Sequence, residues 1–178
     1  VYKNDDNVEY DEHDAKLMED IYKTFIRNGA SLNGKEKESL RALDKELSML
    51  SPKFSNNVLD AQNAFELWVT DDSDLDGLPQ DAVAAASQAA KAKNKEGQWL
   101  FTLQMASYIP FMTYSNKRHL RETLFKAYGG LCNGGKFDNT YIITKIVQLK
   151  HKRAQLLGYK SHADFVLERR MAESIENV

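Results

Sequence analysis

The sequence predicts a mainly α-helical fold, with long amphipathic helices and one small two-stranded β element. Apolar residues recur every three or four positions over most of the 178 residues, and this spacing places them on one face of an α-helix. Two short aromatic segments, 65–69 and 99–103, are instead typical of strands, and they would pair with each other. We therefore expect a single helical domain over residues 1–178.

The first helix is expected from about residue 12 to residue 28. Leu17, Ile21 and Phe25 recur every four residues and form a broad apolar face. Gly29 follows directly, in the position where a glycine commonly ends a helix.

A second, long helix is expected after Asn33. Asn33 and Glu36 have the spacing of a capping box, in which each side chain accepts a backbone N–H of the other residue. A row of apolar residues then follows at intervals of three and four: Leu40, Leu43, Leu47, Leu50 and Phe54. Pro52 lies inside this row and lacks a backbone N–H, so we expect a kink or a break there.

Four further helices are expected in the rest of the chain. Pro79 lies where the first turn of an alanine-rich helix over about 80–94 would begin. The others cover about 117–128, 139–157 and 162–171. Their end signals are Asp138 and the pair Ser161 and Asp164 at N-termini, and Gly158 at a C-terminus.

Composition excludes several classes of protein. The 24 Lys and Arg against 26 Asp and Glu give a net charge of −2, without the basic excess of a nucleic-acid-binding protein. No apolar run approaches the roughly 20 residues that span a bilayer. The one cysteine, Cys132, cannot form a disulfide within the chain. We expect a cytoplasmic protein, with the periplasm as the alternative.

The acidic segment Asp72–Gly77 matches the first half of an EF-hand loop. The match then fails, because Val83 occupies the twelfth position, where calcium needs a bidentate glutamate, and Pro79 lies inside the loop. We interpret the segment as a solvated acidic loop whose carboxylates, Asp76 among them, favour the next helix N-terminus.

The segment from Gly130 to Lys136 resembles a phosphate-binding loop. The next residue is Phe137, so the hydroxyl that would bind magnesium is absent, and a helix rather than a strand precedes the loop. We interpret it as a connection between two helices.

The remaining residues that could carry chemistry are dispersed. The histidines His13, His119, His151 and His162 form no pair with the spacing of zinc ligands on one helical turn. Cys132 has no histidine within ten residues to act as its base. We therefore predict no catalytic, cofactor-binding or metal-binding residue in this chain.

Three segments in the same order resemble one protein family. Residues 156–172, Leu-Leu-Gly-Tyr-Lys-Ser-His-Ala-Asp-Phe-Val-Leu-Glu-Arg-Arg-Met-Ala, resemble a segment of the thimet oligopeptidase and peptidyl-dipeptidase Dcp family. The long-helix pattern over 43–57 resembles the family's N-terminal helix. The Leu-x-Gly-Leu-Pro pattern over 75–79, with the alanine-rich helix and Trp99-Leu100 after it, resembles the next part of the family.

This resemblance implies the N-terminal region of a neurolysin-like zincin fold, and hence part of a zinc metallopeptidase that cleaves short peptides. The family binds one zinc ion through a His-Glu-x-x-His helix, which this sequence does not contain. We therefore expect the catalytic zinc-binding region to lie outside the chain and the chain alone to be inactive. Its implied partners are short peptides, in the parent's channel, and the rest of its own polypeptide.

The branch of the family is predicted from one segment. Trp99-Leu100-x-x-Leu103-Gln104, followed by Ile109-Pro110, is closer to the peptidyl-dipeptidases, which release C-terminal dipeptides. The alternatives are an oligopeptidase of the same family and a free-standing helical interaction module.

Apolar faces that would pack against the rest of such a peptidase are expected to be exposed in this chain. The candidates are Phe111, Met112, Tyr114, Ile142, Ile143, Ile146 and Val147. Large exposed apolar patches rarely persist on a monomer, so the chain is expected to self-associate. The alternative is that these residues pack within the segment itself.

Overall fold

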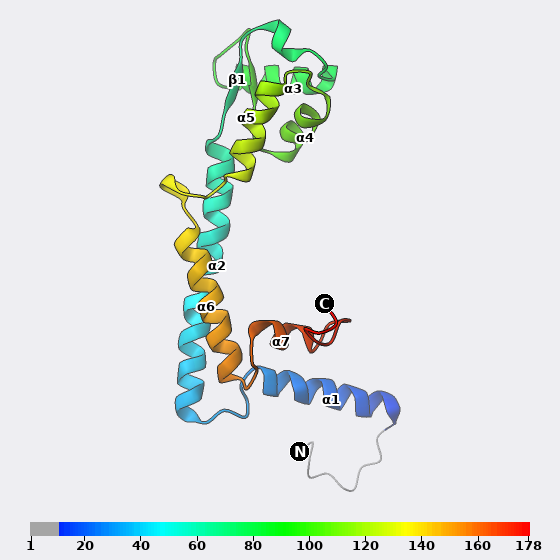
Figure 1. Ribbon diagram of the computed structural model, residues 1–178, viewed down its shortest axis with the longest axis vertical. Coiled ribbons are helices and arrows are strands. Elements are labelled where there is room, and N and C mark those ends of the chain that lie inside the picture. The colour runs from blue at the N-terminus through cyan, green and yellow to red at the C-terminus, as the bar shows by residue number, and fades with distance from the viewer. Residues whose placement is uncertain (1–10) are drawn as a thin grey trace. The chain divides into compact units, whose positions relative to one another are not determined.

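The computed structural model describes residues 11–178, which form helices and one two-stranded antiparallel sheet (Figure 1). They divide into two compact units. The first comprises the described residues up to Ser51 together with Thr144–Val178, and the second comprises Pro52–Ile143. The mainly α fold class with a small β element is confirmed, whereas the single-domain organisation stays a prediction.

In the first unit, helix α1 (Glu12–Arg27) is held by helix α7 (His162–Leu167) through Arg27. The guanidinium of Arg27 donates to the carbonyl of Phe165 over 2.6 Å and lies 4.1 Å from the centre of that residue's ring. It also donates to the hydroxyl of Tyr159 and forms an ion pair with Glu168. Tyr159, Phe165 and Glu168 belong to the segment that carries the family resemblance, so this segment has a structural role here.

The first unit also contains the part of helix α2 (Gly34–Ala64) up to Ser51 and the part of helix α6 (Thr140–Leu156) from Thr144 onwards. Within that unit Glu46 of α2 pairs with Lys145 of α6 over 3.1 Å, and Asp44 pairs with Arg153 over 2.7 Å. The predicted capping box at the start of α2 is confirmed. The backbone N–H of Asn33 donates to the carboxylate of Glu36 over 2.9 Å, and the backbone N–H of Glu36 donates to the side-chain oxygen of Asn33 over 3.1 Å.

Of the kink or break expected at Pro52, the break does not occur, because α2 is one helix from Gly34 to Ala64. Proline cannot donate the bond that the carbonyl of Ser48 would normally accept. Both Pro52 and Ser48 are exposed, so water can solvate that carbonyl and the helix continues.

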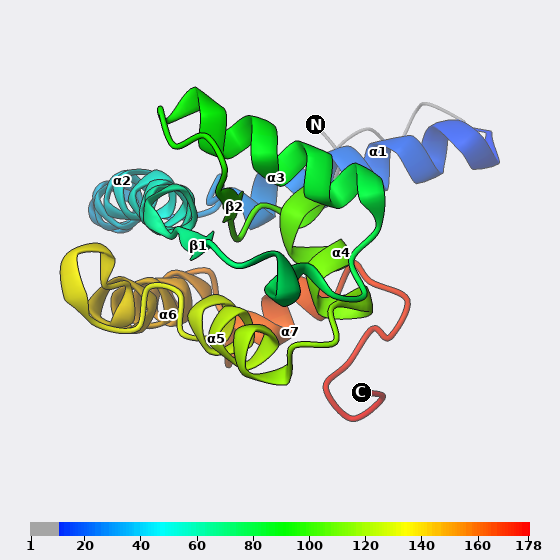
Figure 2. The same cartoon turned by 90° about the horizontal axis from the view of Figure 1, so that it is seen from above.

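The second unit is built on the predicted pair of strands. Strand β1 (Leu67–Val69) pairs antiparallel with strand β2 (Trp99–Phe101), with Trp68 opposite Leu100. Both strands are shorter than the segments that predicted them. Helix α3 (Gln80–Ala92) packs against β2, as Figure 2 shows, and begins one residue after Pro79.

Helix α4 (Met105–Tyr114) is the element that the sequence did not predict. It lies against helix α5 (Arg118–Gly129) and against α3. The ring of Phe111 is fully buried and meets Phe101 edge to face, with 4.6 Å between ring centres. The core of this unit comprises Val69, Ala86, Phe101, Leu103, Phe111 and Leu124.

The end signals of the remaining helices are largely confirmed. Gly29 and Gly158 follow α1 and α6 with positive φ angles of 86° and 89°. Asp138 accepts the backbone N–H of Thr140, the first residue of α6, and Ser161 caps α7. Helix α7 ends at Leu167 rather than near residue 171.

The expected exposed apolar faces are only partly exposed. Phe111 and Ile142 are buried, so the expectation for them is wrong, because each packs inside its own unit. Tyr114, Ile143 and Val147 are exposed, as expected, and Met112 and Ile146 are half-buried.

Candidate functional site

The residues that could bind a metal are placed on separate elements. His13 lies on α1, His119 on α5, His151 on α6 and His162 at the start of α7. Among residues 11–178, no three His, Cys, Asp or Glu side chains lie close enough together to hold a metal ion. The described residues therefore do not fit the zinc ion that the family resemblance implies.

His162, at the start of α7, has an imidazole whose pKa is lowered. Burial lowers the pKa of its imidazole, and the nearby positive charges of Lys150 and Arg153 lower it further. Its ring stacks beside the ring of Phe165, one turn further along the same helix, with 6.1 Å between ring centres.

The acidic loop forms a short 3-10 helix, η1 (Asp72–Leu75), rather than a calcium cage. Its side chains turn to neighbours within the second unit: Asp74 lies 3.8 Å from the ammonium of Lys117, and Asp76 accepts a hydrogen bond from the side chain of Asn116. The backbone carbonyl of Asp76 also accepts the N–H of Asn116. These contacts attach the loop to the start of α5.

The glycine-rich segment connects α5 to α6 through the 3-10 turn η2 (Gly135–Phe137). Asp138 accepts a hydrogen bond from the backbone N–H of Gly134 over 3.0 Å. This N–H, which a phosphate-binding loop would offer to a phosphate, is therefore already bonded to a carboxylate of the protein. Hydrogen bonds from Thr140 and Gly134 lower the pKa of Asp138. Burial, with the charge of Asp138, raises the pKa of the Cys132 thiol, which makes it a poorer nucleophile at neutral pH.

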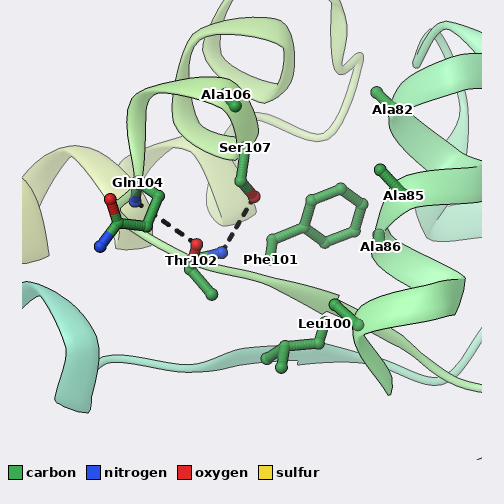
Figure 3. A pocket seen from close by; sticks show the side chains of 10 residues that line it. Ala82, Ala85, Ala86, Leu100, Phe101, Thr102, Gln104, Ala106 and Ser107 are labelled. Atoms are coloured by element: carbon green, nitrogen blue, oxygen red, sulfur yellow. Dashed lines mark hydrogen bonds between the residues drawn. The ribbon is translucent and has the colours of Figure 1, made fainter. Parts of the chain in front are cut away.

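A small hollow of 160 Å³ lies between α3 and the segment that joins β2 to α4 (Figure 3). Alanines of α3 form one wall, and Phe101 with the residues after it forms the other. The backbone N–H of Thr102 donates to the hydroxyl of Ser107, and the amide of Gln104 donates to Asn63. No ionisable side chain lines the hollow, so it can hold an apolar group but cannot supply acid–base chemistry.

The sequence contained one signal for this hollow that its interpretation did not use. Ala82, Ala85, Ala86 and Ala89 are spaced as one face of a helix. Such small side chains leave room between α3 and the elements beside it.

Comparison with known proteins finds similarity to one family of peptidases. The model of peptidase family M3 matches residues 111–178, which include α5, α6 and α7. The probable cytosolic oligopeptidase A of Arabidopsis thaliana is 38% identical over 163 residues, which are 88% of this chain and 23% of that protein.

Two bacterial relatives from one organism agree. Oligopeptidase A of Escherichia coli (strain K12) is 37% identical over 92% of this chain and 25% of that protein. Dipeptidyl carboxypeptidase of the same strain is 28% identical over 99% of this chain and 26% of that protein. The chain thus spans about a quarter of the length of these relatives, and over most of its own length it is similar to oligopeptidases and a dipeptidyl carboxypeptidase, with residues 111–178 matching peptidase family M3.

Proposed function

We propose that the chain is part of an oligopeptidase, an enzyme that hydrolyses internal bonds of short peptides. The observation that carries this proposal is the identity to two enzymes of one organism, 37% to oligopeptidase A against 28% to dipeptidyl carboxypeptidase. The segment around Trp99 and Pro110 favoured the dipeptidase branch, and the alignment with dipeptidyl carboxypeptidase covers 99% of the chain. Release of C-terminal dipeptides is therefore the second candidate.

The two activities differ in how they treat the C-terminus of the substrate. The test uses the complete protein that contains this chain, one peptide as the free acid and as the C-terminal amide, and mass spectrometry of the early products. An oligopeptidase cuts an internal bond in both forms. Successive loss of C-terminal dipeptides from the free acid alone would overturn the proposal in favour of the dipeptidase.

The catalytic zinc is proposed to be bound by residues outside this chain. The support is the dispersal of histidines over α1, α5, α6 and α7, with no metal-binding group among residues 11–178. What the described residues supply is framework: a helical unit held by Arg27 and a second unit with a small hollow beside α3.

We propose the cytosol as the compartment. The Arabidopsis thaliana relative is named as cytosolic, and none of the three relatives above is named as periplasmic. None of the helices between residues 11 and 178 is long and apolar enough to cross a membrane.

A further inference from the structure

Helices α4 and α5 form a shallow trough on the surface of the second unit. One stripe of α5 carries Arg118, Arg121, Phe125 and Tyr128, which are spaced by three, four and three residues and therefore share one side of the helix. Beside it, Tyr108 of α4 stacks on Tyr128 with 4.7 Å between ring centres. Further along, Met112 of α4 lines a depression of 250 Å³ together with Arg118, Arg121, Glu122 and Phe125.

The trough has an aromatic end and a cationic end. Phe125 is 63% exposed and Tyr128 is 37% exposed, and neither belongs to the buried core of the unit. The other end carries the positive charges of Arg118 and Arg121. Glu122 does not neutralise them, because its carboxylate is paired with Lys126 over 2.6 Å. The guanidinium of Arg121 donates to the carbonyl of Ser115, which fixes its position.

Of the two arginines in the trough, Arg118 has a guanidinium without a partner among the described residues. No other residue between 11 and 178 forms a hydrogen bond or an ion pair with its side chain. The carboxylates of Asp74 and Asp76 have partners in the two residues before it, Lys117 and Asn116. An exposed guanidinium beside an exposed aromatic ring fits a ligand that has an anionic group next to an apolar one.

We propose that this trough binds the C-terminal end of a peptide. The terminal carboxylate lies at Arg118 and Arg121, and the apolar side chain of the last residue contacts Phe125 and Met112. The preceding residue lies towards the stacked rings of Tyr108 and Tyr128. This inference rests on the proposed function for the ligand class, since a short peptide with a free C-terminus is what an oligopeptidase binds and produces.

The test measures binding to the 178-residue chain itself, without hydrolysis. The probe is a peptide that carries a dye at its N-terminus and ends in Leu-Phe, prepared as the free acid and as the C-terminal amide, and binding is followed by fluorescence anisotropy. The free acid is expected to bind about tenfold more tightly than the amide, because only it offers an anion to the arginines.

Two variants and one control locate the site. Arg118→Gln should remove most of the preference for the free acid, and Phe125→Ala should weaken both forms. Lys152→Gln removes an exposed charge of α6 and should change neither affinity. Circular dichroism checks that each variant keeps its helices, which is expected because all three side chains are exposed.

Equal affinity for the two peptides, absence of binding, or an unchanged preference in Arg118→Gln would each overturn the inference. A failure of the proposed function is a separate result, because it appears as the absence of internal peptide cleavage by the complete protein. Binding to the chain does not depend on that cleavage.

Discussion

Replacing Gly77 by alanine should destabilise the second unit much more than replacing Gly97. Both glycines have positive φ angles, 87° and 81°, so alanine at either position costs about 1–2 kcal/mol. A Cβ atom at Gly97 would meet nothing within 4 Å. At Gly77 it would lie 2.3 Å from the carbonyl oxygen of Tyr114 and 3.0 Å from the backbone nitrogen of Asn116.

Relief of that clash requires the acidic loop to move away from the start of α5. Asn116 bonds the loop twice, over 2.9 Å to the carbonyl of Asp76 and over 3.0 Å to its carboxylate. Loss of two hydrogen bonds at about 1 kcal/mol each brings the expected cost of Gly77→Ala to about 3–4 kcal/mol. The glycine of the EF-hand-like motif is thus required by close packing.

The measurement is unfolding in urea, followed by tryptophan fluorescence. Trp68 and Trp99 are the only tryptophans of the chain and both belong to the sheet of the second unit, so the signal reports the unit that contains both glycines. Gly97→Ala is the matched control for the backbone cost. Equal losses of stability in the two variants would refute the steric argument.

Three other predictions follow from the same contacts. The lowered pKa of His162 means that its imidazole binds a proton more tightly in the unfolded chain than in the folded one. The first unit should therefore lose stability as pH falls from about the ordinary value of 6.5 towards the lowered pKa. His162→Gln should weaken this pH dependence of stability, and an identical pH profile in the variant would count against it. The acidic loop 72–76 should bind calcium no better than an exposed acidic cluster, because Asp74 and Asp76 have partners in the protein and Val83 offers no oxygen; a micromolar site in calorimetry would contradict this. The chain should self-associate through exposed apolar side chains of α1 and α6, including Phe25 and Val147; a compact monomer at all concentrations in sedimentation would show that these faces need no cover.

The helix ends that carry a local signal were predicted from the sequence almost to the residue. Asn33, Glu36, Ser161 and Gly158 act within a few residues of their own position, so their roles do not depend on the rest of the fold. The pairing of the two strands followed from the same local evidence.

The errors arose where solvent or tertiary packing decides. Pro52 does not break α2, which is consistent with the exposure of Ser48, whose carbonyl it leaves without its usual partner. Helix α4 was not predicted, because it contains Pro110 and is apolar on several sides, so it has no clear amphipathic pattern. The trough was not predicted either, because it needs α4 beside the Arg118–Tyr128 stripe of α5.

The most direct test of the account is a peptidase assay on the purified 178-residue chain beside the complete protein that contains it. Both are supplied with zinc and an internally quenched peptide, with and without a chelator, and their bound zinc is measured. The account predicts cleavage that the chelator abolishes for the complete protein, and neither cleavage nor stoichiometric zinc for the chain alone. One tightly bound zinc per chain with chelator-sensitive cleavage by the chain alone would contradict it.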